Sequence, residues 1–208
     1  MKPAPVAGVG EAGRLQFLLA FSRLIDRVNE RIGQTVYWLV LAAVLVSSGN
    51  AVVRYLFDYS SNGWLEIQWY LFAGFFLIGA GYTLLRNEHV RIDIIISRLS
   101  PRARAWIDLL GGIFFLLPMA LIIMALSWPV FTQSFAIGEY SPNAGGLLRW
   151  PVKLMIPAGF FLLAIQGVSE IIKRAAFLMG LIPDPTPKHA HGAAEEMLPP
   201  ELLQGDKR

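Results

Sequence analysis

Four long stretches that are nearly free of charge constrain the fold of this chain more than any other feature. Residues 32–53, 67–85 and 109–130 contain no Asp, Glu, Lys or Arg, and residues 150–172 contain only Lys153 near one end and Glu170 near the other. A helix of roughly 20 mostly apolar residues crosses a hydrocarbon core about 30 Å thick. Because backbone polar groups must be satisfied inside lipid, each stretch is predicted to be a transmembrane helix.

The composition agrees with lipid as the solvent. Apolar residues make up 55% of the chain and charged residues 16%, whereas soluble domains carry about 25% charged residues. The chain has no cysteine, which excludes disulfides and thiolate metal sites. We therefore expect an all-α integral membrane protein, with a membrane domain over residues 32–175 and spans at about 32–54, 64–85, 106–130 and 150–173.

The placement of basic residues predicts the orientation. Fifteen of the eighteen Lys and Arg residues lie in three regions that four spans place on one side: Lys2, Arg14, Arg23, Arg27, Arg31; Arg86, Arg91, Arg98, Arg102, Arg104; Lys173, Arg174, Lys188, Lys207, Arg208. Short loops rich in Lys and Arg stay in the cytoplasm. Both termini are therefore predicted to be cytoplasmic, and this asymmetry explains the positive net charge without nucleic acid.

The N-terminal segment, residues 1–31, is predicted to contain an amphipathic helix. Over residues 14–32 the apolar positions recur at spacings of three and four, at Leu18, Phe21, Ile25, Val28 and Ile32. Such a helix lies in the membrane interface. It would be either a simple anchor or a surface whose apolar face docks on a partner.

Two further segments are predicted outside the spans. Residues 86–105 alternate charged and apolar residues and are interpreted as an arm along the inner membrane surface, and Ser100 and Pro101 are expected to begin the next helix. Residues 176–208 form a tail with five prolines from Pro183 onward, which is predicted to be disordered.

Polar residues within the spans are few. Arg54 and Glu66 lie at the predicted outer ends of the first two spans, where they could pair with each other or contact a partner subunit. Ser47, Ser48, Gly49 and Asn50 form a small polar patch, which we interpret as a helix-packing surface rather than a substrate path. Lys153 can extend toward the outer interface, and Gly74 and Gly81 share a face as a predicted packing seam.

No catalytic constellation is visible, so neither a cofactor nor enzymatic activity is expected. His89 has no Ser or Cys nucleophile near it, and His189 and His191 lack further ligands that would complete a metal site. Haem would require paired His residues within spans, and all three His residues lie outside them. No span carries the buried carboxylates of a self-sufficient coupled carrier, which favours a supporting subunit over an autonomous four-helix transporter, the alternative hypothesis.

Two motifs in their order around the spans suggest a family. Glu66 and Trp69 stand in the second span, which is followed by Arg-Asn-Glu-His-Val-Arg-Ile-Asp at residues 86–93, and the last span contains Trp150, Pro157 and Gly159. Over about residues 30–175 the chain resembles the small (Q-type) membrane subunit of tripartite ATP-independent periplasmic (TRAP) transporters. The candidate interface or structural residues are Arg54, Glu66, Trp69, Arg86, His89, Arg91, Asp93, Lys153, Pro157 and Gly159.

The resemblance implies a function shared among three proteins. A periplasmic binding protein captures an organic acid, and a large multi-span subunit moves it by an elevator motion driven by an ion gradient, usually sodium. The small subunit packs on the stationary scaffold of the large one. The outer loops near Arg54, Glu66 and residues 139–149 would then face the binding protein, and the inner arm would brace the scaffold.

Overall fold

The computed structural model describes residues 9–88 and 99–185, and all of its regular elements are helical. They are α1 (Val9–Phe57), α2 (Asn62–Leu85), α4 (Pro101–Gly111), the π-helical turn η1 (Gly112–Leu116), α5 (Leu117–Ala136) and α6 (Trp150–Leu178). Helices α4, η1 and α5 follow one another without a break. Four helical stretches are therefore long and apolar enough to cross a membrane, which confirms the predicted all-helical fold with four spans.

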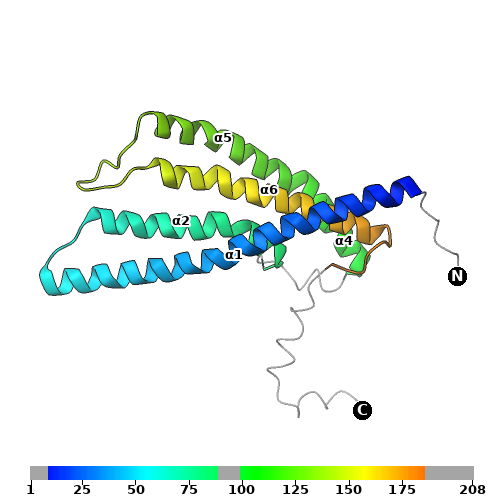
Figure 1. The fold of residues 1–208 in the computed structure, drawn as a ribbon, viewed down its shortest axis with the longest axis horizontal. Helices are drawn as coiled ribbons and strands as arrows, with labels where there is room; N and C mark the ends of the chain where they lie inside the picture. The colour runs from blue at the N-terminus through cyan, green and yellow to red at the C-terminus, as the bar shows by residue number, and fades with distance from the viewer. Residues whose placement is uncertain (1–8, 89–98, 186–208) are drawn as a thin grey trace, which may run out of the picture.

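The helices form two hairpins that pack on each other (Figure 1). The α1–α2 and α5–α6 connections lie at one end of the molecule, and the beginning of α1, the end of α2, the beginning of α4 and the end of α6 lie at the other. Helix α6 contacts α1, α2, α4 and α5, and among the side chains that the structure describes it contributes nine buried residues, more than any other helix. The core of the bundle therefore runs along α6.

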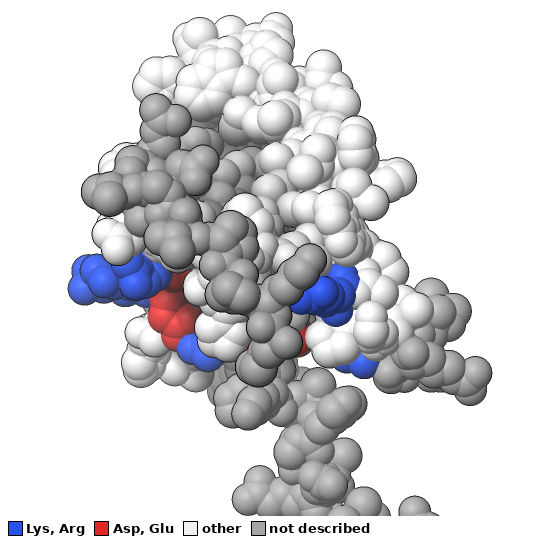
Figure 2. All heavy atoms as spheres, turned by 90° about the vertical axis from the view of Figure 1, so that its right-hand side faces the viewer, with Lys and Arg blue, Asp and Glu red and all other residues white. Residues whose placement is uncertain are grey.

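Charged residues gather at the end where the described chain begins and ends. Figure 2 shows this end, with Lys and Arg in separate groups around it and Asp and Glu beside some of them, whereas the upper part of the same face carries neither. We call this the charged end and the opposite one the loop end. The described chain thus begins and finishes at the same end of the bundle, as a four-span topology requires.

Helix α1 joins the predicted N-terminal helix and the first span into one element. Its 49 residues give a length of about 74 Å at 1.5 Å per residue, more than twice the thickness of a hydrocarbon core. The predicted helix is present, but it packs on the bundle through Ser22, Ile25 and Asn29, which are at most 5% exposed. Phe21 and Val28, on the predicted apolar face, are exposed.

Lipid as the solvent explains why α1 buries small and polar residues and exposes large apolar ones. Lipid is as apolar as Leu or Phe, so large apolar side chains gain little by leaving it, and helix contacts in membranes select small and hydrogen-bonding residues instead. The buried stripe of α1 continues as Gly33 and Val36, at the same spacing of three and four.

The third span begins as the sequence predicts. Ser100 is the N-cap of α4, its Oγ accepts a hydrogen bond from the Ala103 amide at 3.3 Å, and Pro101 occupies the first turn. The π-helical turn η1 ends just before Pro118. Proline cannot donate a backbone hydrogen bond and clashes with the preceding turn, and a π-helical turn is one of the ways in which a helix absorbs such a break.

Glycines allow the helices to approach closely. A Cβ on Gly159 of α6 would lie 2.5 Å from the carbonyl oxygen of Leu77 in α2, and one on Gly81 would lie 3.1 Å from the carbonyl oxygen of Leu162. At Gly74 the nearest atom would be 3.3 Å away, on Leu39 of α1. The predicted seam at Gly74 and Gly81 is confirmed, and Gly159 extends it across the α2–α6 contact.

Candidate functional site

At the loop end, the Glu66 carboxylate binds the connection between α5 and α6. Glu66 is 6% exposed. Its Oε1 accepts hydrogen bonds from the Ser141 hydroxyl and from Asn143 Nδ2 at 3.0 Å, and its Oε2 accepts one from the Leu147 amide at 2.7 Å. A buried carboxylate thus acts as the centre around which the loop folds.

Two neighbours of Glu66 on the same face of α2 hold the same loop. Asn62 Nδ2 donates to the Ala144 carbonyl at 3.1 Å, and the Tyr70 hydroxyl donates to the Leu148 carbonyl at 2.8 Å. Their spacing of four residues from Glu66 places all three side chains on one helix face. The predicted pairing of Glu66 with Arg54 is not what the structure contains, because in the described residues every hydrogen bond of Glu66 goes to this loop.

The loop is also fixed to the start of α6. Lys153 forms an ion pair with Glu139, and both side chains are about one quarter exposed. The Lys153 ammonium holds the pKa of the Glu139 carboxyl below its ordinary value. The Arg149 amide donates to the Glu139 carbonyl at 2.8 Å. Lys153, which was predicted to extend toward the outer interface, pairs with Glu139 in this loop and so closes the loop on its own chain.

Nearer the charged end, a buried network of polar side chains joins α1 to α6. Gln166 Nε2 donates to Asp26 Oδ1 at 2.9 Å and to Glu170 Oε1 at 3.2 Å, and its Oε1 accepts from Asn29 Nδ2 at 2.8 Å. Gln166 and Asn29 are fully buried. The two helices are therefore joined by directional bonds where lipid could not replace a lost partner.

Two serines extend this network. The oxygens of Ser22 and Ser169 lie 2.7 Å apart, and Ser169 Oγ lies 2.7 Å from Asp26 Oδ1. Because an ionised carboxylate only accepts, Ser169 donates to Asp26, and Ser22 must donate to Ser169. Lys173 Nζ completes the network, at 3.1 Å from Asp26 Oδ2 and 2.5 Å from Glu170 Oε1. One cation thus sits between the two carboxylates.

Two ion pairs lie at the end of the network. Arg86, the C-cap of α2, pairs with Glu30 of α1, and its guanidinium carbon lies 5.4 Å from the centre of the Tyr82 ring. Arg174 of α6, whose side chain is 6% exposed, pairs with Asp108 of α4 at 3.3 Å. These pairs connect α6 and α1 to the remaining helices at the charged end.

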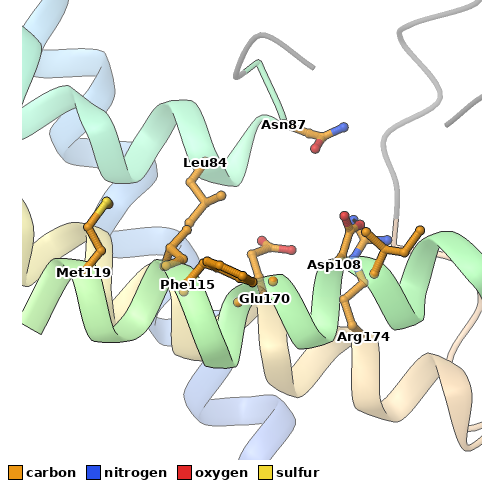
Figure 3. Close-up of a pocket in the computed structure, with 12 residues that line it drawn as sticks. Leu84, Asn87, Asp108, Phe115, Met119, Glu170 and Arg174 are labelled. Atoms are coloured by element: carbon orange, nitrogen blue, oxygen red, sulfur yellow. Dashed lines mark ion pairs between the residues drawn. The ribbon is translucent and has the colours of Figure 1, made fainter. Parts of the chain in front are cut away.

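A cavity of about 580 Å³ opens beside the network, between α2, α4–η1–α5 and α6. Figure 3 shows Asn87, Asp108, Glu170 and Arg174 on one part of its wall and the apolar residues Leu84, Phe115 and Met119 on the other. Glu170 and Arg174 thus line the cavity as well as holding helices together. In the described parts of the chain, no cluster of His, Cys, Asp or Glu could hold a metal ion.

The remaining predicted site residues fall into three groups. Pro157 and Gly159 are buried in α6 against the bundle. Trp69 is 67% exposed on the outer surface of α2, and Arg54 is exposed in the last turn of α1. His89, Arg91 and Asp93 lie outside the described residues, as does half of the predicted inner arm, residues 89–98 of 86–105.

Sequence analysis missed the network. It assigned no contact to Asp26 of the N-terminal helix and treated Glu170 only as a residue near a span end. A signal was present, since Gln166, Ser169, Glu170 and Lys173 recur at spacings of three, one and three along one face of the last span. Ser22, Asp26 and Asn29 form a matching stripe at spacings of four and three.

Comparison with known proteins gives a consistent match. A family model described as the DctQ component of tripartite ATP-independent periplasmic transporters matches residues 43–177. A protein of Haemophilus influenzae named as a TRAP transporter small permease protein is 29% identical over 107 residues, which is 51% of this chain and 64% of that relative. The matched region thus spans less than two thirds of the relative's length. No solved structure matches the chain.

Proposed function

The chain belongs to the DctQ-component family of tripartite ATP-independent periplasmic transporters, and on that premise we propose that it is the small membrane subunit of a binding-protein-dependent transporter for organic acids. Its partners are a large multi-span subunit, which moves the solute using an ion gradient, and a periplasmic solute-binding protein. The chain itself acts as part of the stationary scaffold in the bacterial inner membrane.

The observation that carries the scaffold role is the way in which the buried polar residues are used. Hydrogen bonds from Gln166 of α6 to Asp26 and Asn29 join α6 to α1. Glu66 accepts hydrogen bonds from the connection between α5 and α6. These residues hold elements in place rather than lining a path across the bundle. A scaffold must keep its shape while a neighbouring domain moves, and directional bonds between helices supply that rigidity.

The orientation follows from the charges. Support comes from the charged end, which carries Arg86, Arg102, Arg104, Lys173 and Arg174 together with the basic residues early in α1, because short segments rich in Lys and Arg stay in the cytoplasm. The loop end then faces the periplasm, so the ordered loop around Glu66 becomes the surface that the binding protein meets.

Purification of the tagged chain from its native membrane, with identification of its partners by mass spectrometry, tests the proposal. We expect a large polytopic membrane protein to co-purify in constant ratio with the chain. Recovery of the chain alone, as a stable homo-oligomer, would contradict the proposal and favour an autonomous carrier.

A further inference from the structure

Three arginines form a stripe along α1 at the charged end. Arg23, Arg27 and Arg31 recur every four residues, so their side chains share one side of the helix. All three are exposed. In the described part of the chain, none of the three guanidinium groups makes a hydrogen bond or an ion pair. We call these three residues the arginine stripe.

The carboxylates beside the stripe do not neutralise it. Asp26 and Glu30 lie between the arginines in sequence, but Asp26 bonds to Lys173 at 3.1 Å and Glu30 pairs with Arg86. Both carboxylates therefore hold other helices of the bundle. The stripe is left with a surplus of positive charge on the outside of α1.

The stripe begins at the depth where the second span ends. Arg86 is the C-cap of α2, and its pair with Glu30 places the neighbouring Arg31 at the same level. Arg27 and Arg23 lie about 6 and 12 Å farther along the helix axis. The headgroup layer is about 5–8 Å thick on each side of the hydrocarbon core, and long arginine side chains extend along a helix to reach it. The stripe is therefore within reach of the lipid phosphates.

The same face of α1 becomes apolar toward the loop end. Trp38 follows Arg31 after seven residues and Leu41 follows after three more, so both continue the line of the stripe. Trp38 is 69% exposed and Leu41 is 47% exposed. Tryptophan is typical of the membrane interface. The face thus changes from basic to aromatic to aliphatic, in the order in which a lipid leaflet changes from phosphate to acyl chain.

We propose that this face of α1 binds an anionic phospholipid, whose phosphate contacts the arginine stripe and whose acyl chains lie along Trp38 and Leu41. Arginine donates paired, charge-assisted hydrogen bonds to phosphate oxygens. An anionic lipid is favoured over a zwitterionic one, because a zwitterionic headgroup brings a further cation to a surface that already has three. The inference goes beyond the proposed transport function and does not depend on it.

The surroundings of the stripe favour a lipid over an acidic segment of another protein. Phe21, Leu24 and Val28 are exposed beside the arginines, and apolar side chains next to cations are typical of helix surfaces that enter the boundary between headgroups and acyl chains. A protein would have to supply carboxylates and apolar groups in the same order along α1. A phospholipid presents its phosphate and its acyl chains in that order by its own structure.

Binding of defined lipids to the purified chain tests the proposal. The full-length chain in mild detergent is titrated with phosphatidylglycerol or with phosphatidylcholine, and native mass spectrometry counts the lipids bound. We expect phosphatidylglycerol to bind at the lower concentration. Arg27→Gln should weaken its binding about fivefold, the factor for about 1 kcal/mol per basic residue near an anionic surface. The thermal stability of the lipid-free chain should not change, because Arg27 has no partner within the described chain.

Two further variants separate the stripe from the general charge of the chain. Arg102→Gln is the matched control, since it removes one exposed positive charge from α4 at the same end of the bundle. It should leave the affinity for phosphatidylglycerol unchanged. Arg27→Lys, which keeps the charge, should retain more of that affinity than Arg27→Gln.

Four results would overturn the inference. Equal affinity for the two lipids would show that the surface does not select negative charge. Equal losses in Arg27→Gln and Arg102→Gln would show that only net charge matters. If sodium phosphate stabilises the chain against heat as phosphatidylglycerol does, when compared with sodium chloride at equal ionic strength, the stripe binds free phosphate. If Arg27→Gln keeps its affinity for phosphatidylglycerol but loses a membrane protein that co-purifies with the wild type, the stripe is a protein contact.

Discussion

The side-chain amide of Gln166 donates to the carboxylate of Asp26 at 2.9 Å, across 140 residues of sequence. This contact ties the cytoplasmic half of α1, as we orient it, to the central helix of the bundle. It also holds the N-terminal part of α1 against the bundle, where Ser22 and Asn29 are buried. The helix keeps its polar stripe against α6 and leaves its large apolar residues to the lipid.

The first prediction concerns this contact. Gln166→Leu removes a donor from Asp26 and the acceptor of Asn29, leaving buried groups unsatisfied, so we expect a loss of about 1–3 kcal/mol in the stability of the chain. Thermal unfolding in detergent, followed by circular dichroism, measures it. Gln133→Leu is the control, because Gln133 is exposed near the end of α5 and should change little. Equal stability of the two variants would contradict the role of the network.

The second prediction concerns the closest contact of α2 and α6. In Gly159→Ala the new methyl group would lie 2.5 Å from the Leu77 carbonyl oxygen, and since a backbone atom cannot turn aside, the helices must separate. We expect a cost of about 1–3 kcal/mol. Gly111→Ala, where a Cβ meets nothing within 4 Å, should be neutral or slightly stabilising. A neutral Gly159→Ala would show that the two helices are not in close contact.

The sequence alone predicts the helices that these two substitutions test, but it does not predict their contacts. The four spans follow from apolar runs, and Ser100 with Pro101 marks a helix start, because both signals are local. The continuity of α1 could not be read in the same way, because charged residues at 23–31 resemble the end of a span. Within this segment Asp26 and Asn29 contact Gln166 of α6, which is more than 130 residues distant in the sequence.

The partners of Glu66 were unpredictable for a related reason. Arg54 is near Glu66 in sequence and opposite in charge, which made an ion pair the simplest hypothesis. The actual partners lie 75 to 81 residues away, in a loop whose shape depends on backbone conformation, including a positive φ of 71° at Gly145. The spacing of residues near Glu66 in the sequence therefore does not predict these contacts.

The third prediction concerns that loop. Glu66→Ala removes the acceptor of the Leu147 amide and of two side chains, so the loop should open. Hydrogen exchange at Leu147 should accelerate about tenfold or more, the factor that corresponds to a loss of about 1.4 kcal/mol. Glu88→Ala, an exposed carboxylate at the opposite end, is the control. Unchanged protection of Leu147 would show that Glu66 does not hold the loop.

The fourth prediction is a dependence on pH. The pKa of Glu139 is lowered in the folded chain by Lys153, so this ion pair contributes stability at pH values above the ordinary carboxyl pKa. That contribution disappears as the pH falls through the lowered pKa. Glu139→Gln should therefore be less stable than the wild type at pH 7 and equal to it near the acid limit. A difference that stays constant with pH would exclude the ion pair as its cause.

The most direct measurement of the central claim is solute uptake into proteoliposomes that contain this chain alone, the large subunit alone, or both. Each preparation receives an imposed ion gradient and the solute-loaded binding protein. The scaffold account predicts sustained uptake from the pair and none from the chain alone. Uptake by the chain alone, or full uptake by the large subunit without it, would contradict the account.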